Sequence, residues 1–348
     1  MKALQFPGSR EVFIKEFPDP KPGKDEVVIR MKASGICGSD LNYLYRIPKE
    51  EKDKYVLGVW VSSTVIPGHE PCGIVEEVGE NVTHLKKGDR VIVYHISGCG
   101  VCKSCREGYY MHCKNKKTYG FDINGSFADF MVAKEKDCVL LPDELSFEEG
   151  CYYACGAGTA FKACKRLNIS GLDTVSIFGL GPVGLAAVMF AKKFGGKVIA
   201  VDPIDVRRDI AKNIGADYVI NPLEEDVVRE IKKITDGEGT SVSIECSSNP
   251  TARSQILDST KIWGKVAYVG EGKTVTIDVS NQIIHKHLTI FGSWVYTIPE
   301  LMDLLNFAAK EKLNLPALIT HQFTLDEAEE ALKLADSGKS GKIVFKWD

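Results

Sequence analysis

The middle of the chain alternates short apolar runs with longer stretches in which apolar residues recur at helical spacing. The clearest unit opens at 174–178, Thr-Val-Ser-Ile-Phe, a β-branched and aromatic run that predicts a strand. A glycine-rich turn follows, and alanine and large apolar residues then fill 185–193, which predicts a helix. A second apolar run at 198–201 predicts another strand. Strand, tight turn, helix and strand together make one βαβ unit.

The same alternation continues beyond this unit. Further apolar runs predict strands, and the amphipathic stretches between them predict helices. Strands that alternate with helices indicate a doubly wound parallel sheet, which we expect across residues 153–289. The predicted strands are 217–220, 241–245 and 265–269, and the predicted helices are 207–214 and 226–235.

Residues 1–152 lack this alternation. Short β runs at 26–31, 73–78 and 90–94 are separated by glycine, proline and aspartate, which predicts an irregular β-rich domain. The pattern alone does not say how these strands pair.

The last part of the chain departs from the alternation again, with amphipathic helices predicted at 298–310 and 326–337 and a last strand at 342–345. At 348 residues the chain exceeds the size that one core usually supports, so we expect two domains in an α/β fold. The expected domains are 1–152 together with 290–348, and 153–289 between them.

The turn at the centre of the βαβ unit has the spacing of a dinucleotide-binding site. Gly179 would make the tight turn, Gly181 would let the backbone approach a pyrophosphate, and Gly184 would let helix and strand pack closely. The phosphates would sit on the free N–H groups and the positive dipole end of the new helix. A glycine-rich turn alone is weak evidence for a dinucleotide-binding site. A strand, a turn, a helix, a second strand and an acid in this order form a specific pattern.

The acid is Asp202, which stands 18 residues after Gly184 at the end of the second strand. Its carboxylate can accept hydrogen bonds from both ribose hydroxyls and would repel a 2′-phosphate, so the pattern favours NAD over NADP. The expected cofactor site also includes residues of the turn and of the next predicted helix, namely Pro182, Val183 and Arg207.

Charge and hydropathy exclude two classes of partner. The formal net charge is -3 and Lys and Arg are dispersed, so the chain carries no electrostatic footprint for nucleic acid. Residues 1–7 contain no apolar signal region, and no stretch approaches the length of a membrane span. We therefore expect a cytoplasmic protein that binds neither nucleic acid nor membrane.

Four of the 11 cysteines lie close together in the pattern C-x2-C-x2-C-x7-C. Four thiolates, with glycines easing the turns, can close a tetrahedral zinc site that leaves no position for substrate, which makes such a site structural. An iron–sulfur cluster and unliganded thiols are the alternatives, although the C-x3-C-P ending of the bacterial iron–sulfur run is absent. The lone cysteines 72, 138, 151, 164 and 246 are by default small buried hydrophobes. The four clustered cysteines are Cys99, Cys102, Cys105 and Cys113.

A second, dispersed metal site is suggested by two short sequences, 35–40 (Gly-Ile-Cys-Gly-Ser-Asp) and 68–73 (Gly-His-Glu-Pro-Cys-Gly). Taken singly, Cys37 is as consistent with a core cysteine, and His69 with a satisfied polar residue, as with a metal ligand. Each lies in a glycine-flanked turn beside a β run, and a nicotinamide enzyme needs an electrophile. Zinc with three protein ligands and an open position would polarise an alcohol.

The order of these motifs resembles a known family. G-I-C-G-S-D, G-H-E-P-C-G-I-V-E-E-V-G, K-G-D-R-V, the four-cysteine lobe and G-L-G-P-V-G with Asp202 together resemble the zinc-containing medium-chain dehydrogenases, the alcohol and polyol dehydrogenase superfamily. The resemblance covers essentially the whole chain. It implies a GroES-like catalytic domain built from the N-terminal part and the tail, a Rossmann domain between them, NAD and two zinc ions per chain. Dimers or tetramers are common among such proteins, so we expect a homo-dimer or homo-tetramer.

The resemblance also implies the ligands of the catalytic zinc. Cys37 and His69 match two of them, and Glu70 matches a ligand or exchanging neighbour of the metal. For the next ligand we choose Cys155, in Ala-Cys-Gly-Ala-Gly-Thr-Ala, because alcohol dehydrogenases place a cysteine in a similar segment. Polyol-type members often use a glutamate in that region, so Glu149 is an alternative, as is Cys151.

Further roles follow from the same resemblance. Ser39 matches the hydroxyl that accepts the substrate proton, and Asp40 matches the acid that orients the histidine ligand. Thr159 resembles the residue packed on the nicotinamide. A histidine that continues the proton relay in many alcohol dehydrogenases would fall at Asn42, which cannot titrate. We therefore expect a different proton exit, through ribose and water.

The substrate is less well defined by the sequence. His95 resembles in position a residue that lines the substrate pocket, where simple alcohol dehydrogenases place an aromatic ring, although a structural histidine is an equal alternative. Tyr43, Tyr45, Trp60 and Trp294 offer faces for a sugar or are core aromatics. We favour a secondary alcohol of a polyol, cyclitol, sugar or sugar acid. An L-threonine-type substrate and a simple secondary alcohol are the alternatives.

Two alternative hypotheses assign the protein to a different functional class. A zinc-independent reductase on the same scaffold would lack the cysteine lobe and the G-H-E motif, both of which are present. A zinc-lobe binding protein without catalysis would need no dinucleotide fingerprint. Zinc content separates them, because about two ions per chain support the dehydrogenase, one supports the structural lobe alone and none supports the reductase.

Overall fold

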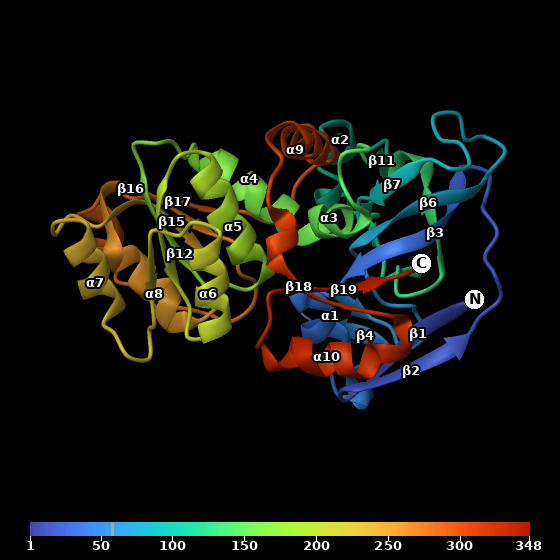
Figure 1. The fold of residues 1–348 in the computed structure, drawn as a ribbon, viewed down its shortest axis with the longest axis horizontal. Coiled ribbons are helices and arrows are strands. Elements are labelled where there is room, and N and C mark those ends of the chain that lie inside the picture. Colours follow the sequence, from blue (N-terminus) through green and yellow to red (C-terminus); the bar gives the residue numbers. More distant parts are fainter. Residues whose placement is uncertain (57–58) are drawn as a thin grey trace. The chain divides into compact units, whose positions relative to one another are not determined.

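The protein is described by a computed structural model that covers residues 1–56 and 59–348 (Figure 1). Its contacts divide it into two compact units. The first comprises residues 1–158, 296–337 and 342–348, and the second comprises residues 159–295 and 338–341. The division therefore falls after Gly158 and after Val295, whereas the boundaries expected from the pattern are 152 and 289. None of the helices in the described ranges is long and apolar enough to cross a membrane.

The second unit is built on a six-stranded sheet in the order β14-β13-β12-β15-β16-β17, in which every neighbouring pair is parallel. Helices α5 and α6 pack against β13, and α8 packs against β15 and β16. Figure 1 shows α5, α6 and α8 beside the strands of this sheet. This confirms the predicted doubly wound α/β fold. The elements are β12 (Thr174–Phe178), β13 (Lys197–Val201), β14 (Tyr218–Ile220), β15 (Thr240–Glu245), β16 (Thr260–Tyr268), β17 (Thr289–Gly292), α4 (Gly158–Leu167), α5 (Pro182–Lys193), α6 (Asp205–Asn213), α7 (Val227–Ile234), α8 (Pro250–Ser259) and η6 (Val279–Ile284).

The first unit contains a seven-stranded sheet in the order β11-β7-β6-β3-β19-β18, with β10 also paired to β3. Strand β19 runs antiparallel to β3, so residues 342–346 return to the N-terminal part, an arrangement that the family resemblance implied and the pattern alone did not. The sheet strands are β3 (Glu26–Gly35), β6 (Pro71–Val78), β7 (Arg90–Val93), β10 (Phe130–Lys134), β11 (Cys138–Leu140), β18 (Ile319–Phe323) and β19 (Lys342–Lys346).

Hairpins, short helices and two longer helices complete the first unit. The hairpins are β1 (Lys2–Gly8) with β2 (Glu11–Glu16), β4 (Lys54–Val56) with β5 (Val59–Val61), and β8 (Ile96–Ser97) with β9 (Lys117–Thr118). The helices are α1 (Gly38–Asp40), η1 (Leu41–Tyr45), η2 (Lys49–Glu51), α2 (Lys103–Arg106), η3 (Tyr110–His112), η4 (Glu135–Asp137), α3 (Phe147–Tyr152), η5 (Tyr153–Ala157), α9 (Ile298–Glu311), η7 (Leu315–Leu318), η8 (Leu325–Glu327) and α10 (Ala328–Ser337).

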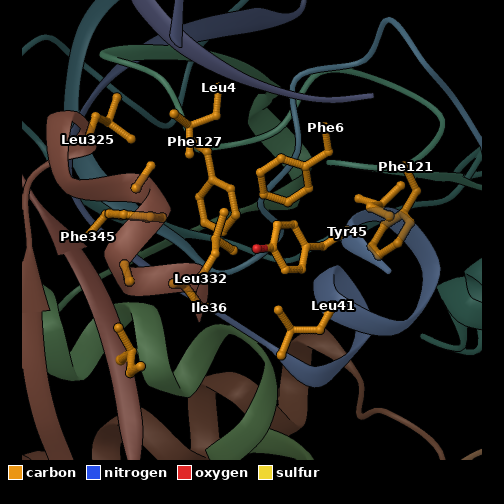
Figure 2. Packing of buried hydrophobic residues seen from close by; sticks show 14 of the residues in the cluster. Leu4, Phe6, Ile36, Leu41, Tyr45, Phe121, Phe127, Leu325, Leu332 and Phe345 are labelled. Carbon is orange, nitrogen blue, oxygen red and sulfur yellow. The ribbon is translucent and has the colours of Figure 1, made fainter. Parts of the chain in front are cut away.

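One apolar core of this unit joins segments from both ends of the chain. Figure 2 shows Phe6, Tyr45, Phe127, Leu332 and Phe345 converging on the same buried cluster. The rings of Phe6 and Tyr45 meet edge to face with centroids 5.8 Å apart, and those of Phe127 and Phe345 do so at 5.0 Å. Because Tyr45 ends η1, this core fixes the turn that carries residues 37–40.

Candidate active site and metal centres

Four predicted residues of the first unit come together in one cluster. Ligand atoms of Cys37, His69, Glu70 and Cys155 all lie within 4.8 Å of one another. Cys37 follows β3 and His69 precedes β6, and these two strands pair antiparallel, with the Gly35 N–H donating to the Glu70 carbonyl at 3.2 Å. The sheet therefore joins two motifs that are distant in sequence, and η5 adds Cys155.

Asp40 positions two members of this cluster. Its carboxylate is fully buried, and one oxygen lies 2.9 Å from His69 Nδ1 while the other accepts the Cys37 backbone N–H at 2.9 Å. Because a carboxylate can only accept here, Nδ1 of His69 carries a proton. Against the effect of burial, Asp40 and Cys37 raise the pKa of His69, and Nε2 becomes a metal donor once it has lost its own proton. One side chain thus orients both the histidine and the loop of the first cysteine.

The pKa values of the two cysteines in the cluster are shifted in opposite directions. The Cys155 thiol donates to Cys37 and, together with the charge on His69 and against the effect of burial, lowers the pKa of Cys37 well below its ordinary value. The same hydrogen bond and burial raise the pKa of Cys155. A thiolate is the form that zinc binds, so the site already favours an anionic ligand at Cys37.

One member of the cluster, Glu70, forms a buried ion pair with Lys342. Glu70 and Lys342 are both fully buried, and Lys342 Nζ contacts Glu70 Oε2 and donates to the Ile36 carbonyl at 2.9 Å. Although burial lowers it, the pKa of Lys342 is raised overall, chiefly by the Glu70 carboxylate. Glu70 Oε1 has no hydrogen-bond partner in the described structure. A buried carboxylate oxygen without a donor, beside a thiolate and an imidazole, fits a cation at this position.

The alternatives for the cysteine ligand lie elsewhere. Glu149 accepts the Ser146 N–H at 2.9 Å and so caps helix α3. The buried Cys151 thiol donates to the Glu148 carbonyl at 3.2 Å. The structure therefore brings Cys155, and neither alternative, to the other three side chains.

His95 lies beside this cluster. It is buried, its ring centroid is 5.4 Å from that of His69, and its Nδ1 is 3.0 Å from the Ala154 carbonyl oxygen. A carbonyl only accepts, so Nδ1 carries the proton and Nε2 is an acceptor. Burial and the charge on His69 lower the pKa of His95 to about 3, so the ring is neutral at working pH.

Ser39 and Asn42 occupy the turn after Cys37. Ser39 is half-buried, with its Oγ 4.0 Å from Cys37 Sγ. Asn42 is exposed and its side-chain oxygen accepts a hydrogen bond from Arg46 Nη1 at 2.6 Å. No titratable group therefore stands at position 42, and the proposed proton exit through ribose and water stays a prediction.

The four-cysteine motif forms a second cluster in the first unit. The sulfur atoms of Cys99, Cys102, Cys105 and Cys113 lie within 4.8 Å of one another. The backbone N–H groups of residues 101 and 102 lower the pKa of Cys99 to about 6. Glycines at 100 and 108 adopt φ of +80° and +85°, which side chains rarely tolerate, and so allow the tight turns. Four converging sulfurs with one already acidic fit a tetrahedral metal site.

The second unit holds a cavity of about 500 Å³ at the carboxyl end of β12 and β13. Gly179, Gly181, Asp202 and Arg207, which are expected to bind the cofactor, line it. Gly179 has φ of +88°, Gly181 has open space on its Cβ side, and a Cβ on Gly184 would overlap the Gly179 carbonyl. The glycines thus leave room at the N-terminus of α5, where a pyrophosphate can bind backbone N–H groups.

Asp202 is held rigidly at this cavity. Its Oδ2 accepts the Leu180 N–H at 2.7 Å and its Oδ1 accepts the Ile204 N–H at 2.8 Å. Arg207 lies with Nη1 4.0 Å from Asp202 Oδ2 and donates through Nε to the Ser340 carbonyl at 3.2 Å. The carboxylate is therefore fixed by the backbone rather than by a strong ion pair.

Some expected cofactor residues do not line the cavity, and some unexpected ones do. Pro182 and Val183 form the first turn of α5, and Thr159 lies in the first turn of α4; none of the three faces this cavity. Cys246, interpreted from sequence as a buried hydrophobe, does line it, since it directly follows β15. The lining residues not identified from the sequence include Ser247, Asn249 and Thr251, whose Ser-Ser-Asn-Pro context marks a strand end followed by a helix.

Comparison with known proteins defines the family. Residues 23–143 match the alcohol dehydrogenase GroES-like domain, and residues 182–310 match the zinc-binding dehydrogenase family. The chain is 40% identical to the uncharacterized zinc-type alcohol dehydrogenase-like protein YphC of Escherichia coli K12, across 100% of this chain and 99% of that protein. The chain belongs to the zinc-type alcohol dehydrogenase family.

Other relatives of this dehydrogenase are named for different substrates. An L-threonine 3-dehydrogenase of Pyrococcus horikoshii is 40% identical over 94% of this chain and 92% of that protein. The crystal structure of 2R,3R-butanediol dehydrogenase from Bacillus subtilis superposes with a TM-score of 0.88 at 29% identity, covering 100% of this chain and 99% of that one. The predicted family, its GroES-like and Rossmann folds and its cofactors NAD and zinc are confirmed; the count of two zinc ions per chain stays a prediction.

The aromatic residues considered as sugar-binding faces do not form one set. Tyr45 is buried in the core shown in Figure 2, which removes it from consideration. Tyr43 packs partly buried against the same core. Trp294 belongs to the second unit and is 41% exposed, and the side chain of Trp60 lies outside the described residues. The substrate contacts of the dehydrogenase therefore have to be argued from His95 and the cysteine cluster.

An Asp202→Asn variant is expected to lower the preference for NAD over NADP by roughly 10- to 100-fold, because a charge-assisted hydrogen bond contributes about 1.5–3 kcal/mol. The ratio of kcat/KM for the two cofactors measures it. Asp209→Asn is the matched control, since Asp209 is an exposed aspartate of α6 that does not line the cavity. An unchanged ratio in the Asp202 variant would contradict a ribose-binding role.

Proposed function

We propose that this dehydrogenase oxidises a secondary alcohol of a neutral polyol, cyclitol or sugar with NAD, reversibly. The observation that carries the proposal is the neutral His95, whose Nδ1 donates to the Ala154 carbonyl and whose Nε2 is left as an acceptor near the cysteine–histidine cluster. A substrate with a second hydroxyl group beside the reacting carbinol can donate to that nitrogen. A simple alcohol has no such group, so the buried acceptor would go unpaired.

Each residue of the cluster has a proposed role. Cys37, His69 and Cys155 would hold zinc, with Glu70 as its neighbour or exchanging ligand. Zinc, when bound, supplies a Lewis acid that acidifies the alcohol, and NAD accepts the hydride. Ser39 would take the proton of the alcohol, and Asp40 keeps His69 in the tautomer that presents Nε2.

The charges around the cluster favour a neutral substrate. Besides His69, the cation that acts on Cys37, Glu70 and Cys155 is Lys342. Its ammonium group is committed to the Glu70 carboxylate and to the Ile36 carbonyl. A substrate carboxylate would therefore find no free cation among these groups and would have to be desolvated without a partner. Sugar acids and amino acids are disfavoured for this reason.

L-Threonine is the second candidate. It is supported by the relative that is named L-threonine 3-dehydrogenase and is 40% identical to this chain. The ammonium group of threonine could also donate to His95 Nε2. The carboxylate of threonine would find no free cation among these groups. Butanediol, for which a structural relative is named, carries only hydroxyl groups.

A substrate panel tests the proposal. NAD reduction would be measured with xylitol, sorbitol, myo-inositol, 2,3-butanediol, L-threonine and 2-propanol, on enzyme whose zinc content is known. We expect the highest kcat/KM for a polyol or diol and a loss of that advantage in His95→Ala. A preference for L-threonine or 2-propanol would contradict the neutral polyol. One zinc per chain without turnover would instead support a zinc-lobe binding protein without catalysis.

A further inference from the structure

In the first unit, the Ala154 carbonyl oxygen accepts hydrogen bonds from two buried side chains. His95 donates to it through Nδ1 at 3.0 Å, and the hydroxyl of Tyr296 also donates to it. The same hydroxyl lies 3.1 Å from the Tyr153 carbonyl. Both carbonyls belong to η5, a π-helical turn whose next residue is Cys155. Such turns depart from regular helical bonding and are frequent at functional sites.

Tyr296 is itself fixed from several directions. The Tyr94 hydroxyl donates to the Tyr296 carbonyl at 2.6 Å, and the two rings meet edge to face with centroids 5.5 Å apart. Gly158 makes room for the ring, because a Cβ there would overlap it. Tyr94 directly precedes His95, so the contacts close a ring from His95 to Ala154, Tyr296, Tyr94 and back to His95. All of its side chains are buried.

The direction of the hydrogen bonds in this ring is determined by chemistry. Burial raises the pKa of Tyr296 well above its ordinary value, so its hydroxyl keeps its single proton and donates it to the nearer carbonyl, that of Ala154. The Ala154 oxygen can only accept, so it selects the His95 tautomer with a proton on Nδ1. If the peptide at Ala154 turned away, this selection would be lost.

We propose that Tyr296 is a positioning residue for substrate selection: through the Ala154 carbonyl it holds His95 in the tautomer whose Nε2 accepts a hydrogen bond from the second hydroxyl group of the substrate. The inference rests on the proposed function for its kinetic consequence. Its structural part, the tautomer of His95, does not depend on which alcohol is oxidised.

A Tyr296→Phe variant tests the kinetic part, because it keeps the ring and removes the hydroxyl. We expect kcat/KM for the preferred polyol to fall by about 3- to 10-fold, mainly through KM, as for the loss of one neutral hydrogen bond. Activity with 2-propanol should change less than about twofold, since that substrate makes no such bond. Equal losses for both alcohols, or loss of zinc, would overturn the proposal in favour of a general structural role.

Tyr268→Phe is the matched control. Tyr268 is a tyrosine of the second unit whose hydroxyl also donates to a backbone carbonyl, that of Arg253, at 2.7 Å, and it does not line the cofactor cavity. This variant should not distinguish polyol from 2-propanol. A Tyr94→Phe variant, which loosens Tyr296 indirectly, should discriminate in the same direction as Tyr296→Phe but less strongly; it serves if Tyr296→Phe does not fold.

Nitrogen-15 NMR of histidine-labelled enzyme tests the structural part. The chain has seven histidines, and the His95 signals are identified by their loss in His95→Asn. We expect a protonated Nδ1 and a bare Nε2 in the parent enzyme and a mixture of tautomers in Tyr296→Phe. An unchanged tautomer in the variant would overturn the proposal even if polyols are substrates. The expected tautomer shift with no polyol activity would instead leave Tyr296 as the positioning residue and reject the proposed substrate.

Discussion

A Cys37→Ser variant of the dehydrogenase is expected to lose at least about 1000-fold in turnover while binding NADH as the parent enzyme does. Removing a mere hydrogen-bond partner of a metal ligand costs about 10–100-fold in metal affinity or activity, and here a thiolate ligand itself is lost. Cys37 is also the residue of the cluster whose pKa is lowered, so it supplies the preformed negative charge. The cavity of the second unit, lined by Gly181 and Asp202, is untouched by the change.

Zinc analysis, turnover and NADH fluorescence titration measure these effects together. The variant should lose about one zinc per chain, with the four-cysteine lobe still occupied. Cys138→Ser is the control, because the Cys138 thiol donates to the Lys134 carbonyl at 3.5 Å and belongs to neither sulfur cluster. Sustained turnover by a metal-free Cys37→Ser enzyme would remove the metal-ligand assignment.

A Lys342→Met variant is expected to lower the free energy of unfolding by about 3–5 kcal/mol, which is the usual effect of breaking a buried ion pair. The loss would arise because Glu70 would remain buried with neither carboxylate oxygen neutralised. A Glu70→Gln/Lys342→Met double variant should recover part of it, since it buries no unpaired charge. Denaturant unfolding of zinc-loaded and chelated protein separates the ion pair from the metal.

The same strand supplies a matched control for this prediction. Lys346, also on β19, pairs with Glu148 at 2.9 Å, but its side chain is 50% exposed. An exposed pair contributes about 0–1 kcal/mol, so Lys346→Met should unfold nearly as the parent does. If the Lys342 and Lys346 variants were equally stable, the buried pair would not be a determinant of the fold.

The parts of the fold that sequence predicted well are those encoded locally. The βαβ unit at 174–201 could be predicted from sequence because the strand periodicity, the glycine turn and Asp202 all lie within one short stretch. Helix α8 was not predicted, since polar residues interrupt its apolar stripe although Arg253 and Ile256 are buried. Strand β17 was missed because only four residues pair at the sheet edge.

The candidate site depends even more on contacts between residues that are distant in sequence. Cys37 and His69 stand in recognisable motifs, yet nothing near them in sequence points to Lys342 or Tyr296, which arrive through strand pairing and backbone contacts. The resemblance favoured Cys155 over Glu149 as a zinc ligand. Only the structure shows that the η5 turn brings Cys155, and not Glu149, to the other three side chains. The roles assigned to these residues stay predictions that the variants above address.

The pairing of β19 with β3 also affects biosynthesis. Ribosomes deliver Cys37 and Glu70 long before Lys342, and the whole of residues 159–295 emerges in the interval. Until residue 342 leaves the exit tunnel, the Glu70 carboxylate has no lysine to accompany it into the interior. Nascent chains should therefore bury the metal centre late, and a pause in translation before β19 would lengthen the time for which its thiols stay exposed to solvent.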